Sequence, residues 1–289
     1  MTREPVLKTE KLTHIYSEGT PFEMAALRGV DMEVLPGEFL GIIGHTGSGK
    51  STLIQHLNGL IQPTSGSVFF KGEDIFASKE LTHALRFHVG LVFQYPEYQL
   101  FDETVYKDIA FGPRNMKLGS AEIDERVHEA AGFAGVSEEM LEKSPFELSG
   151  GQKRRVAIAG VIAMRPEVLI LDEPTAGLDP EGCRDIFRNL VEYRNKTGSA
   201  IVMVTHSMED AARYADRLVV INEGKAALSG TPDEVFSHAR ELRDMGLELP
   251  AATVIAEKLR ELGVPLRGSL YTVDRLRDAI LDCRRESRA

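Results

Sequence analysis

GHTGSGKST, at Gly44–Thr52, is the stretch that decides the fold. It follows the short apolar run Phe39–Ile43 and precedes Leu53–Leu57, an order that indicates strand, loop and helix. The spacing fits G-x-x-x-x-G-K-[ST], the pattern of a phosphate-binding loop. Glycines let the backbone curl so that successive N–H groups point at one anion, and the positive end of the following helix adds to this.

The whole loop is therefore predicted to bind a nucleotide. Lys50 is expected to bridge the β- and γ-phosphates, and Ser51 to place its hydroxyl on Mg²⁺. The alternative is a Gly-rich turn that binds nothing, but all fixed positions match and both flanks have the expected pattern. The predicted nucleotide-binding residues of the loop are Gly44, His45, Thr46, Gly47, Ser48, Gly49, Lys50, Ser51 and Thr52.

Length and composition limit the classes of protein that remain. A chain of 289 residues suggests one large domain with an appendage, or two domains. A net charge of −10 argues against a nucleic-acid partner held by bulk charge, although a local basic patch stays open. Cys183 and Cys283 fit no metal spacing, and we expect reduced thiols.

No apolar run approaches the roughly 20 residues that span a bilayer, and the N-terminus does not resemble a signal peptide. Any membrane role is thus expected to act through a partner.

The rest of the chain predicts an α/β protein with a parallel sheet. The continuous apolar runs 168–171 and 200–205 are typical of strands buried on both faces, with the helix 181–196 between them. Short strands are expected in the N-terminal third, including one over 6–12 and one within 86–93. From about 96 to 165 the spacing is helical, as in Ile123, Val127, Ala130, Ala131 and Ala134, with breaks at Pro113, Gly119 and Pro145.

The last fifty or so residues form a different region. We place a first domain over 1–237, with the helical insertion at about 96–165, and a helical extension over 238–289. Two helices are expected there, with apolar faces formed by Ile255, Leu259 and Leu262 and by Val273, Leu276 and Ile280. Because such short helices bury little alone, they must pack on the main body or on another subunit, and both possibilities stay open.

Polar side chains follow the predicted buried strands. Asp172 ends one strand at the carboxyl edge of the sheet, where ligands sit, and is expected to hold Mg²⁺. Glu173 is expected to accept a proton from the attacking water. Gln94 is expected to reach Mg²⁺ or the water, and His206 to bond the γ-phosphate. Each would be an ordinary polar residue at a strand end if it stood alone.

A second motif, LSGGQ, starts a predicted helix over 153–163, with Ser149 as its N-cap. Its small residues allow backbone N–H groups to approach an anion at a helix N-terminus. The motif lies in the helical insertion and need not contact the nucleotide of its own chain. Its residues are Leu148, Ser149, Gly150, Gly151 and Gln152.

The phosphate loop, Gln94, LSGGQ, VLILDEP, AGLD and His206 occur in the order and spacing of ATP-binding cassette ATPases, which the chain resembles over about 6–236. The resemblance implies ATP and Mg²⁺, and a head-to-tail dimer in which LSGGQ of one subunit clamps the γ-phosphate bound by the other. It also implies that Asp179 contacts that interface. Tyr16 matches the aromatic residue that stacks on adenine, and the alternative is an ordinary half-buried strand tyrosine.

A narrower resemblance is to the ATPases of energy-coupling-factor transporters, more to the second of their two paralogues than to the first. It is carried by GTPFE, GHTGSGKSTLIQHLNGL, PTSG, FQYPEYQLF and RRVAIAGVIA. Lys153 departs from the apolar residue expected after LSGGQ. The resemblance implies a peripheral protein on the cytoplasmic side of the cell membrane. Its implied partners are a second ATPase (a paralogue or the chain itself), a membrane coupling protein and a substrate-binding membrane subunit, with no nucleic acid. In that group the C-terminal extension joins the two ATPases.

Three other functions were weighed. Soluble cassette ATPases that act on DNA or ribosomes usually carry a coiled-coil insertion or two cassettes, and neither is evident here. A phosphate-loop kinase would have no reason to keep LSGGQ or AGLD. A nucleotide-gated assembly module without catalysis would not need Glu173 and His206. The interpretation that best accounts for all motifs is an ATPase that powers uptake of a vitamin or a transition-metal ion.

Overall fold

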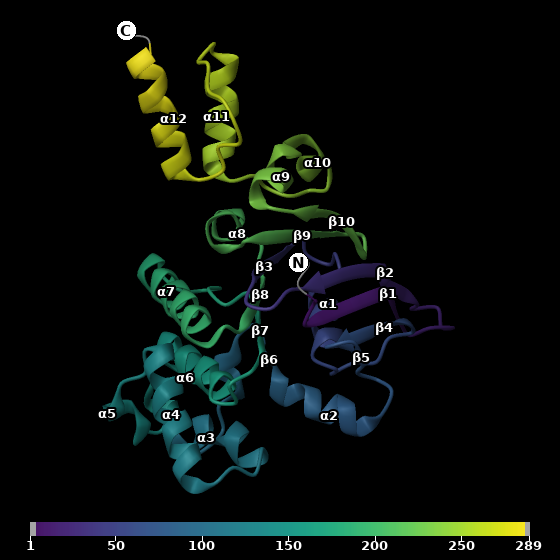
Figure 1. Ribbon diagram of the computed structural model, residues 1–289, viewed down its shortest axis with the longest axis vertical. Helices are drawn as coiled ribbons and strands as arrows, with labels where there is room; N and C mark the ends of the chain where they lie inside the picture. The colour runs from purple at the N-terminus through teal and green to yellow at the C-terminus, as the bar shows by residue number, and fades with distance from the viewer. Residues whose placement is uncertain (1–3, 287–289) are drawn as a thin grey trace.

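A six-stranded sheet lies at the centre of the computed structural model, which describes residues 4–286 (Figure 1). Its order is β10-β9-β3-β8-β7-β6, and all its strands are parallel except β10, which pairs antiparallel with β9. Every residue of β3, β7 and β8 is buried because the sheet is covered on both faces. The strands are β3 (Phe39–Ile43), β6 (Val89–Val92), β7 (Val168–Asp172), β8 (Ala200–Val204), β9 (Arg217–Asn222) and β10 (Lys225–Gly230).

A second, antiparallel sheet has the order β2-β1-β4-β5. Helix α1 (Lys50–Leu57) lies between the two sheets, and its buried Leu53, Ile54 and Leu57 share one core with both of them. The first strand is longer than the sequence predicted, since pairing with its neighbour continues to Tyr16 opposite Met24. The strands are β1 (Leu7–Tyr16), β2 (Met24–Val34), β4 (Ser65–Phe70) and β5 (Glu73–Asp74).

Helices cover the other face of the six-stranded sheet and extend beyond its edge at the lower left of Figure 1. The spacing predicted for α4 is confirmed, since Val127, Ala130, Ala131 and Ala134 are all buried. The helices are α3 (Val105–Asn115), α4 (Ser120–Ala134), α5 (Glu138–Leu141), α6 (Gly150–Ile162) and α7 (Pro180–Thr197), with 3-10 helices η1 (Pro96–Gln99) and η2 (Pro145–Glu147).

The strand expected within 86–93 is confirmed as β6. Helix α2 (Lys79–His88), which directly precedes it and is capped by Ser78, was not predicted, and among its residues only Leu85 is buried. One expected break was wrong. Pro113 does not break the insertion, because it lies near the end of α3, where a missing N–H disturbs little of the helix.

The C-terminal part packs in two layers. Helices α8 (Met208–Tyr214), α9 (Pro232–Ser237) and α10 (Ala239–Asp244) cover β9, while α11 (Ala251–Glu261) and α12 (Val273–Glu286) share a small core of their own. The predicted apolar faces were wrong in part: Ile255, Leu262 and Val273 are 49%, 80% and 72% exposed. The helices meet instead through small residues, Ala252 and Ala256, which allow close approach. Within residues 4–286, no helix is both long and apolar enough to cross a membrane.

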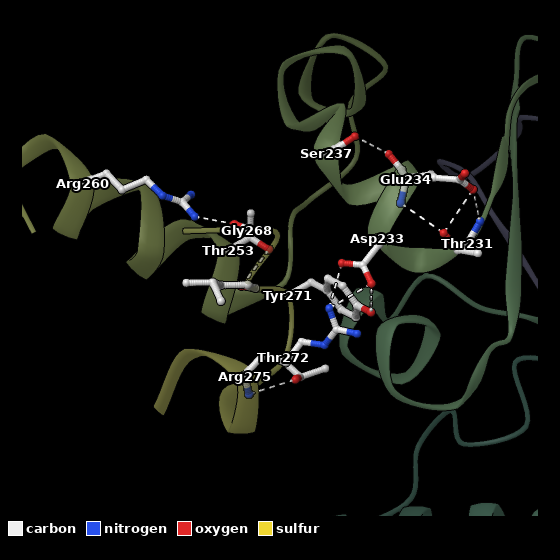
Figure 2. Close-up of polar contacts among 11 residues, drawn as sticks. Thr231, Asp233, Glu234, Ser237, Thr253, Arg260, Gly268, Tyr271, Thr272 and Arg275 are labelled. Atoms are coloured by element: carbon white, nitrogen blue, oxygen red, sulfur yellow. Dashed lines mark hydrogen bonds and ion pairs between the residues drawn. The ribbon is translucent and has the colours of Figure 1, made fainter. Parts of the chain in front are cut away.

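A polar junction joins the extension to the body (Figure 2). Asp233, in α9, accepts hydrogen bonds from the Tyr271 hydroxyl (3.1 Å) and from Nη1 of Arg275 (2.7 and 2.9 Å). The guanidinium of Arg275 also lies 4.3 Å from the centre of the Tyr271 ring. A capping box between Thr231 and Glu234 fixes the start of the helix that carries Asp233. One carboxylate thus sets how the base of α12 sits on the body.

We expect Asp233→Ala to loosen the extension without unfolding the body. Amide exchange over 251–286 should rise about two- to fivefold, since a half-exposed pair of this kind contributes about 0.5–1 kcal/mol. Exchange in β3, β7 and β8 should stay at the parent rate, as measured by hydrogen–deuterium exchange mass spectrometry. Arg277→Ala is the matched control, because within residues 4–286 Arg277 pairs inside α12, with Asp274 and Asp278. Equal exchange in Asp233→Ala and in the parent would show that the junction does not hold the extension.

Candidate functional site

Four neighbouring strands end at one edge of the sheet and carry the predicted polar residues with them. The register pairs Val92 with Leu171, Asp172 with Val204, and Ile42 with Val204. The loops after β6, β7, β8 and β3 therefore meet, as expected at the carboxyl ends of parallel strands. They line a cleft of about 820 Å³, within the range of small-molecule sites. Its predicted site residues are His45, Thr46, Gly47, Gly49, Lys50, Ser51, Thr52, Gln94, Asp172, Glu173 and His206.

The shape of the phosphate loop requires glycine at two positions. A Cβ on Gly44 would lie 2.3 Å from the carbonyl oxygen of Ile221, and one on Gly49 would lie 2.5 Å from that of Ala26. Gly49 also has φ +108°, which side chains rarely adopt. The loop can therefore pass close to β2 and to the β9–β10 turn only without side chains. Lys50 closes it by donating from Nζ to the carbonyls of Gly44 (2.6 Å) and His45 (2.9 Å).

The donor groups of the cleft fit a magnesium triphosphate. The Ser51 hydroxyl donates to Oδ2 of Asp172 at 3.2 Å, which places a hydroxyl and a carboxylate oxygen together, the ligand type that Mg²⁺ prefers. Gln94, exposed at the end of the next strand, adds an amide oxygen to the lining. At Gly47, φ is +82° and a Cβ would meet nothing within 4 Å, so the loop is open at that point. Among the described residues, the buried Ser48 Oγ has no hydrogen-bond partner.

Burial and charge oppose each other at this site. Burial lowers the pKa of Lys50, although the nearby carboxylates of Glu173 and Asp172 act to raise it. Burial raises the pKa of Asp172, a change that the Ser51 hydrogen bond and the Lys50 charge partly offset. Each group therefore holds its charge less favourably than in water, and a ligand that brings the opposite charge would relieve both.

Glu173 is held in an unusual backbone conformation. Its φ is +50°, a region that costs a non-glycine residue about 1–3 kcal/mol unless neighbours hold it. Its N–H donates to the Val204 carbonyl (2.9 Å), and its carboxylate lies 2.8 Å from Nδ1 of His206. The carboxylate is mostly buried whereas the imidazole is largely exposed. The pair therefore places a carboxylate and an imidazole together in the lining of the cleft, beside the Lys50 loop.

Tyr16 lies beside the phosphate loop without lining the cleft. Its hydroxyl is 3.2 Å from Oγ1 of Thr52, and its ring meets the His14 ring edge-on at 4.5 Å. His14 in turn contacts His56 at 4.8 Å. The predicted adenine contact of Tyr16 remains a prediction, supported by this position at the end of the loop.

The LSGGQ residues lie apart from this cleft, none of whose described lining residues comes from 148–152. Ser149 is the N-cap of α6, as predicted, and forms a capping box with Gln152. Asp179 likewise caps α7, its carboxylate accepting from the Gly182 N–H at 2.7 Å. Both helix starts are exposed and lie outside their own chain's cleft.

Sequence analysis missed part of the cleft wall. Ala25, Ala26 and Arg28 of β2 line the cleft beside the loop, with Glu223 and Gly224 of the β9–β10 turn. The Arg28 N–H donates to the Gly224 carbonyl at 2.8 Å, which joins these two segments. Neither the β2 segment nor the β9–β10 turn carries a sequence motif, so only the packing of the two sheets reveals that these segments line the cleft.

Comparison with known proteins agrees with this site. The family model described as ABC transporter matches residues 27–176. The chain is 53% identical to "Energy-coupling factor transporter ATP-binding protein EcfA2" of Caldanaerobacter subterraneus, over 95% of this chain and 96% of the relative. It is 54% identical to the protein of the same name from Symbiobacterium thermophilum, over 92% of each. The chain belongs to the energy-coupling factor ATPases of the ABC transporter family. The predicted family is thereby confirmed.

Solved structures confirm the fold class. A structure titled as cbiO1 from Clostridium perfringens, part of the ABC transporter complex cbiONQ, matches with a TM-score of 0.74 and 44% identity, over 86% of this chain and 96% of that one. The dimeric cassette MJ0796 in a post-hydrolysis state with ADP and Pi matches with a TM-score of 0.71 and 29% identity, over 78% and 98%. As a member of this family the chain is an ATPase, so the predicted activity is confirmed as well.

His56 supports the phosphate-loop helix and gives a pH prediction. It is fully buried, its Nδ1 donates to the Thr52 carbonyl (2.7 Å), and burial lowers its pKa to about 4. Below the ordinary pKa of about 6.5, the unfolded state binds a proton that the folded state rejects. The free energy of unfolding should therefore decrease as the pH is lowered. From this group alone, the decrease from about pH 7.5 to about pH 5 is about 2 kcal/mol.

We expect His56→Leu to lose that component. The pH dependence of its unfolding free energy, from urea titrations at both pH values, should be shallower than the parent's by about 2 kcal/mol. His83→Gln serves as control, since His83 is exposed on α2. A parallel pH dependence in parent and His56→Leu would mean that His56 titrates normally in the folded state.

Proposed function

We propose that this chain is the ATP-hydrolysing subunit of an energy-coupling factor importer, which powers uptake of a vitamin or transition-metal ion. The observation that carries the proposal is that Lys50, Ser51, Asp172, Glu173 and His206 line one cleft. The chain is also similar to members of that family over nearly its whole length. Relatives named as transporter ATP-binding proteins, and a structural neighbour titled as part of the ABC transporter complex cbiONQ, support a role as one subunit of such a complex.

Roles for the cleft residues follow from their positions. Lys50 would move from the Gly44 and His45 carbonyls to the β- and γ-phosphates of ATP. Ser51, Asp172 and Gln94 would hold Mg²⁺, which supplies charge neutralisation on the transferring phosphoryl group. The remaining loop residues, Gly44 to Thr52, would wrap the phosphates, and Tyr16 would contact the adenine.

Glu173 is the proposed general base. It would take the proton of the attacking water while His206, 2.8 Å away, orients its carboxylate and contacts the γ-phosphate. In this proposal the exposed N-terminus of α6 completes the site of a second ATPase subunit, with Ser149 presenting its hydroxyl and Gly151 its N–H group, since the Ser149 N–H is bonded to Gln152. Leu148, Gly150 and Gln152 shape that helix start, and Asp179 faces the same interface. The second subunit is a paralogue or a second copy of this chain.

The exposed aromatic surface between Gln94 and α3 is the proposed contact for the membrane coupling protein. Tyr98 is 85% exposed, and Phe101 packs edge-on against Phe111 at 5.0 Å with both rings largely open. Exposed aromatic clusters of this kind mark protein interfaces. Docking there would place the chain peripherally on the cytoplasmic side of the membrane, next to the loop that carries Gln94.

The extension, for which we propose the bounds 238–289, is the proposed contact between the two ATPases. Ile255, Leu262, Val273 and Leu281 are exposed apolar residues on α11 and α12 or at the end of α11. The expected packing on the body also occurs, since Leu247, Leu249 and Tyr271 belong to a core with α8 and β9. Packing at the base leaves the outer apolar side chains available for a second subunit.

Replacing the proposed base tests the enzymatic part of this function. Glu173→Gln should bind ATP with parent affinity but lower kcat at least about a hundredfold, because only proton abstraction is lost. ATP-bound dimers should accumulate in size-exclusion chromatography with MgATP. Glu167→Gln is the matched control at the other end of β7, where Glu167 pairs with Lys71 and His88. Hydrolysis by Glu173→Gln at the parent rate would mean that another group is the base.

Isolation from native membranes tests the transport part. A tagged chain purified in mild detergent should bring with it an integral membrane protein and a second ATPase subunit, identified by mass spectrometry. Phe101→Ser should lose the membrane protein while keeping ATP binding. Phe22→Ser is the control, because Phe22 is 83% exposed in the β1–β2 turn, away from the proposed contact. Recovery of ribosomes or DNA with no membrane protein would favour a soluble cassette ATPase.

A further inference from the structure

Arg154 is a buried cation that the proposed mechanism does not use. It lies in α6, five positions after Ser149, with 2% of its side chain exposed. A buried guanidinium needs several acceptors, because desolvation of the charge is costly. Its neighbour Glu97 supplies both carboxylate oxygens, at 3.2 Å from Nε and 3.2 Å from Nη2. The remaining nitrogen, Nη1, donates to the carbonyls of Pro174 (3.4 Å) and Ala176.

Those two carbonyls belong to the turn that begins at Glu173. The Ala176 N–H donates to the Glu173 carbonyl at 3.1 Å and closes the turn. Glu173 has the left-handed φ of +50° that only its surroundings can maintain. The guanidinium therefore holds the far side of the same turn whose first residue is the proposed base.

The carboxylate of Glu97 belongs to the other loop of the site. It lies in η1, between Gln94 and the exposed aromatic surface. Tyr95, which precedes η1, also has a left-handed φ of +57°, and its ring centre is 6.0 Å from Cζ of Arg154. Two strained strand-end residues, Tyr95 after β6 and Glu173 after β7, are thus connected through one side chain.

We propose that Arg154 is a positioning residue that makes the placement of Glu173 depend on the position of the segment 95–101. Its planar fork can keep one edge on Glu97 and present Nη1 to the turn carbonyls, so a shift of the 95–101 segment displaces the turn. A partner that docks on Tyr98 and Phe101 would thereby adjust the hydrolytic site. This inference rests on the proposed roles of Glu173 and of the aromatic surface, and it adds the physical connection between them.

Kinetics of the full chain, in the assembly in which the parent hydrolyses ATP, test the positioning role. Arg154→Met keeps an unbranched apolar stem but removes the guanidinium and its charge, and Glu97→Gln leaves the guanidinium on the turn but weakens its link to η1. We expect each to lower kcat about ten- to a hundredfold, the cost of a small misplacement of a catalytic group, with KM for ATP within about threefold of the parent. Arg154→Lys should not rescue, because one ammonium cannot span both loops.

Arg126→Met is the matched control. Arg126 is also a mostly buried arginine that pairs with a glutamate, Glu122, and donates to a carbonyl, that of Met164. It lies on α4, away from both loops, so its loss should affect thermal stability but leave kcat within about twofold of the parent. If Arg154→Met does not fold, Glu97→Gln still decides the question, because the guanidinium keeps its turn acceptors.

A fluorescent probe separates positioning from plain structural support. The probe is attached at Tyr98→Cys after Cys183 and Cys283 are replaced by Ala, in Glu173→Gln protein to block hydrolysis. MgATP should change its emission, and Arg154→Met should abolish that change while nucleotide affinity persists. A response that survives, or a lowered melting temperature with parental kcat, overturns the proposal. Normal ATP hydrolysis by the single variant Glu173→Gln would disprove only the assignment of the base. Loss of the emission change in Arg154→Met would still show that Arg154 connects the 95–101 segment to the nucleotide site.

Discussion

The register of four parallel strands is the constraint on which the rest of this structure depends. Because β6, β7, β8 and β3 are neighbours in that order, their following loops reach the same edge of the sheet. A slip of one residue would turn Asp172 from the cleft toward a hydrophobic layer and would bury the wrong face of each strand. The alternation of the strands between two cores, with Leu169 and Leu171 on one side and Val168 and Ile170 on the other, makes such a slip costly. Core packing therefore determines where the catalytic groups lie.

Much of this arrangement could be predicted from sequence because it is encoded locally. In the phosphate loop, Gly44 and Gly49 stand where a Cβ would strike the Ile221 or the Ala26 carbonyl, so these two positions of the motif follow directly from the geometry. The buried strands are continuous apolar runs, and the cap of α6 is visible as Ser149 followed by Gln152. Signals of this kind need no knowledge of distant residues.

Other features depend on tertiary contacts and left no such signal. In the extension the sequence marked Ile255 and Leu262 as core, yet Ala252 and Ala256 form the contact, since small residues let the helices approach closely. The connection from Glu97 to Arg154 spans 57 positions in the chain, and a charged pair so distant cannot be inferred from spacing. The same is true of the wall that Ala25 and Gly224 contribute to the cleft.

The charge balance of the cleft supports the proposal that one chain supplies half of a working site. Lys50 is a half-buried cation beside two carboxylates, and it already donates hydrogen bonds to the Gly44 and His45 carbonyls. A triphosphate carries more negative charge than one lysine can offset, and Asp172 and Glu173 add to the repulsion. Mg²⁺ can offset the charge around Asp172, but the γ-phosphate also needs donors on the side facing away from the loop. The start of α6 offers N–H groups and a positive dipole end without any titratable group. Since that helix start lies outside its own chain's cleft, the proposed dimer would supply these donors from a second subunit. Binding of ATP would then favour the closed dimer of ATPase subunits. Loss of the γ-phosphate would remove the contacts that hold the dimer closed.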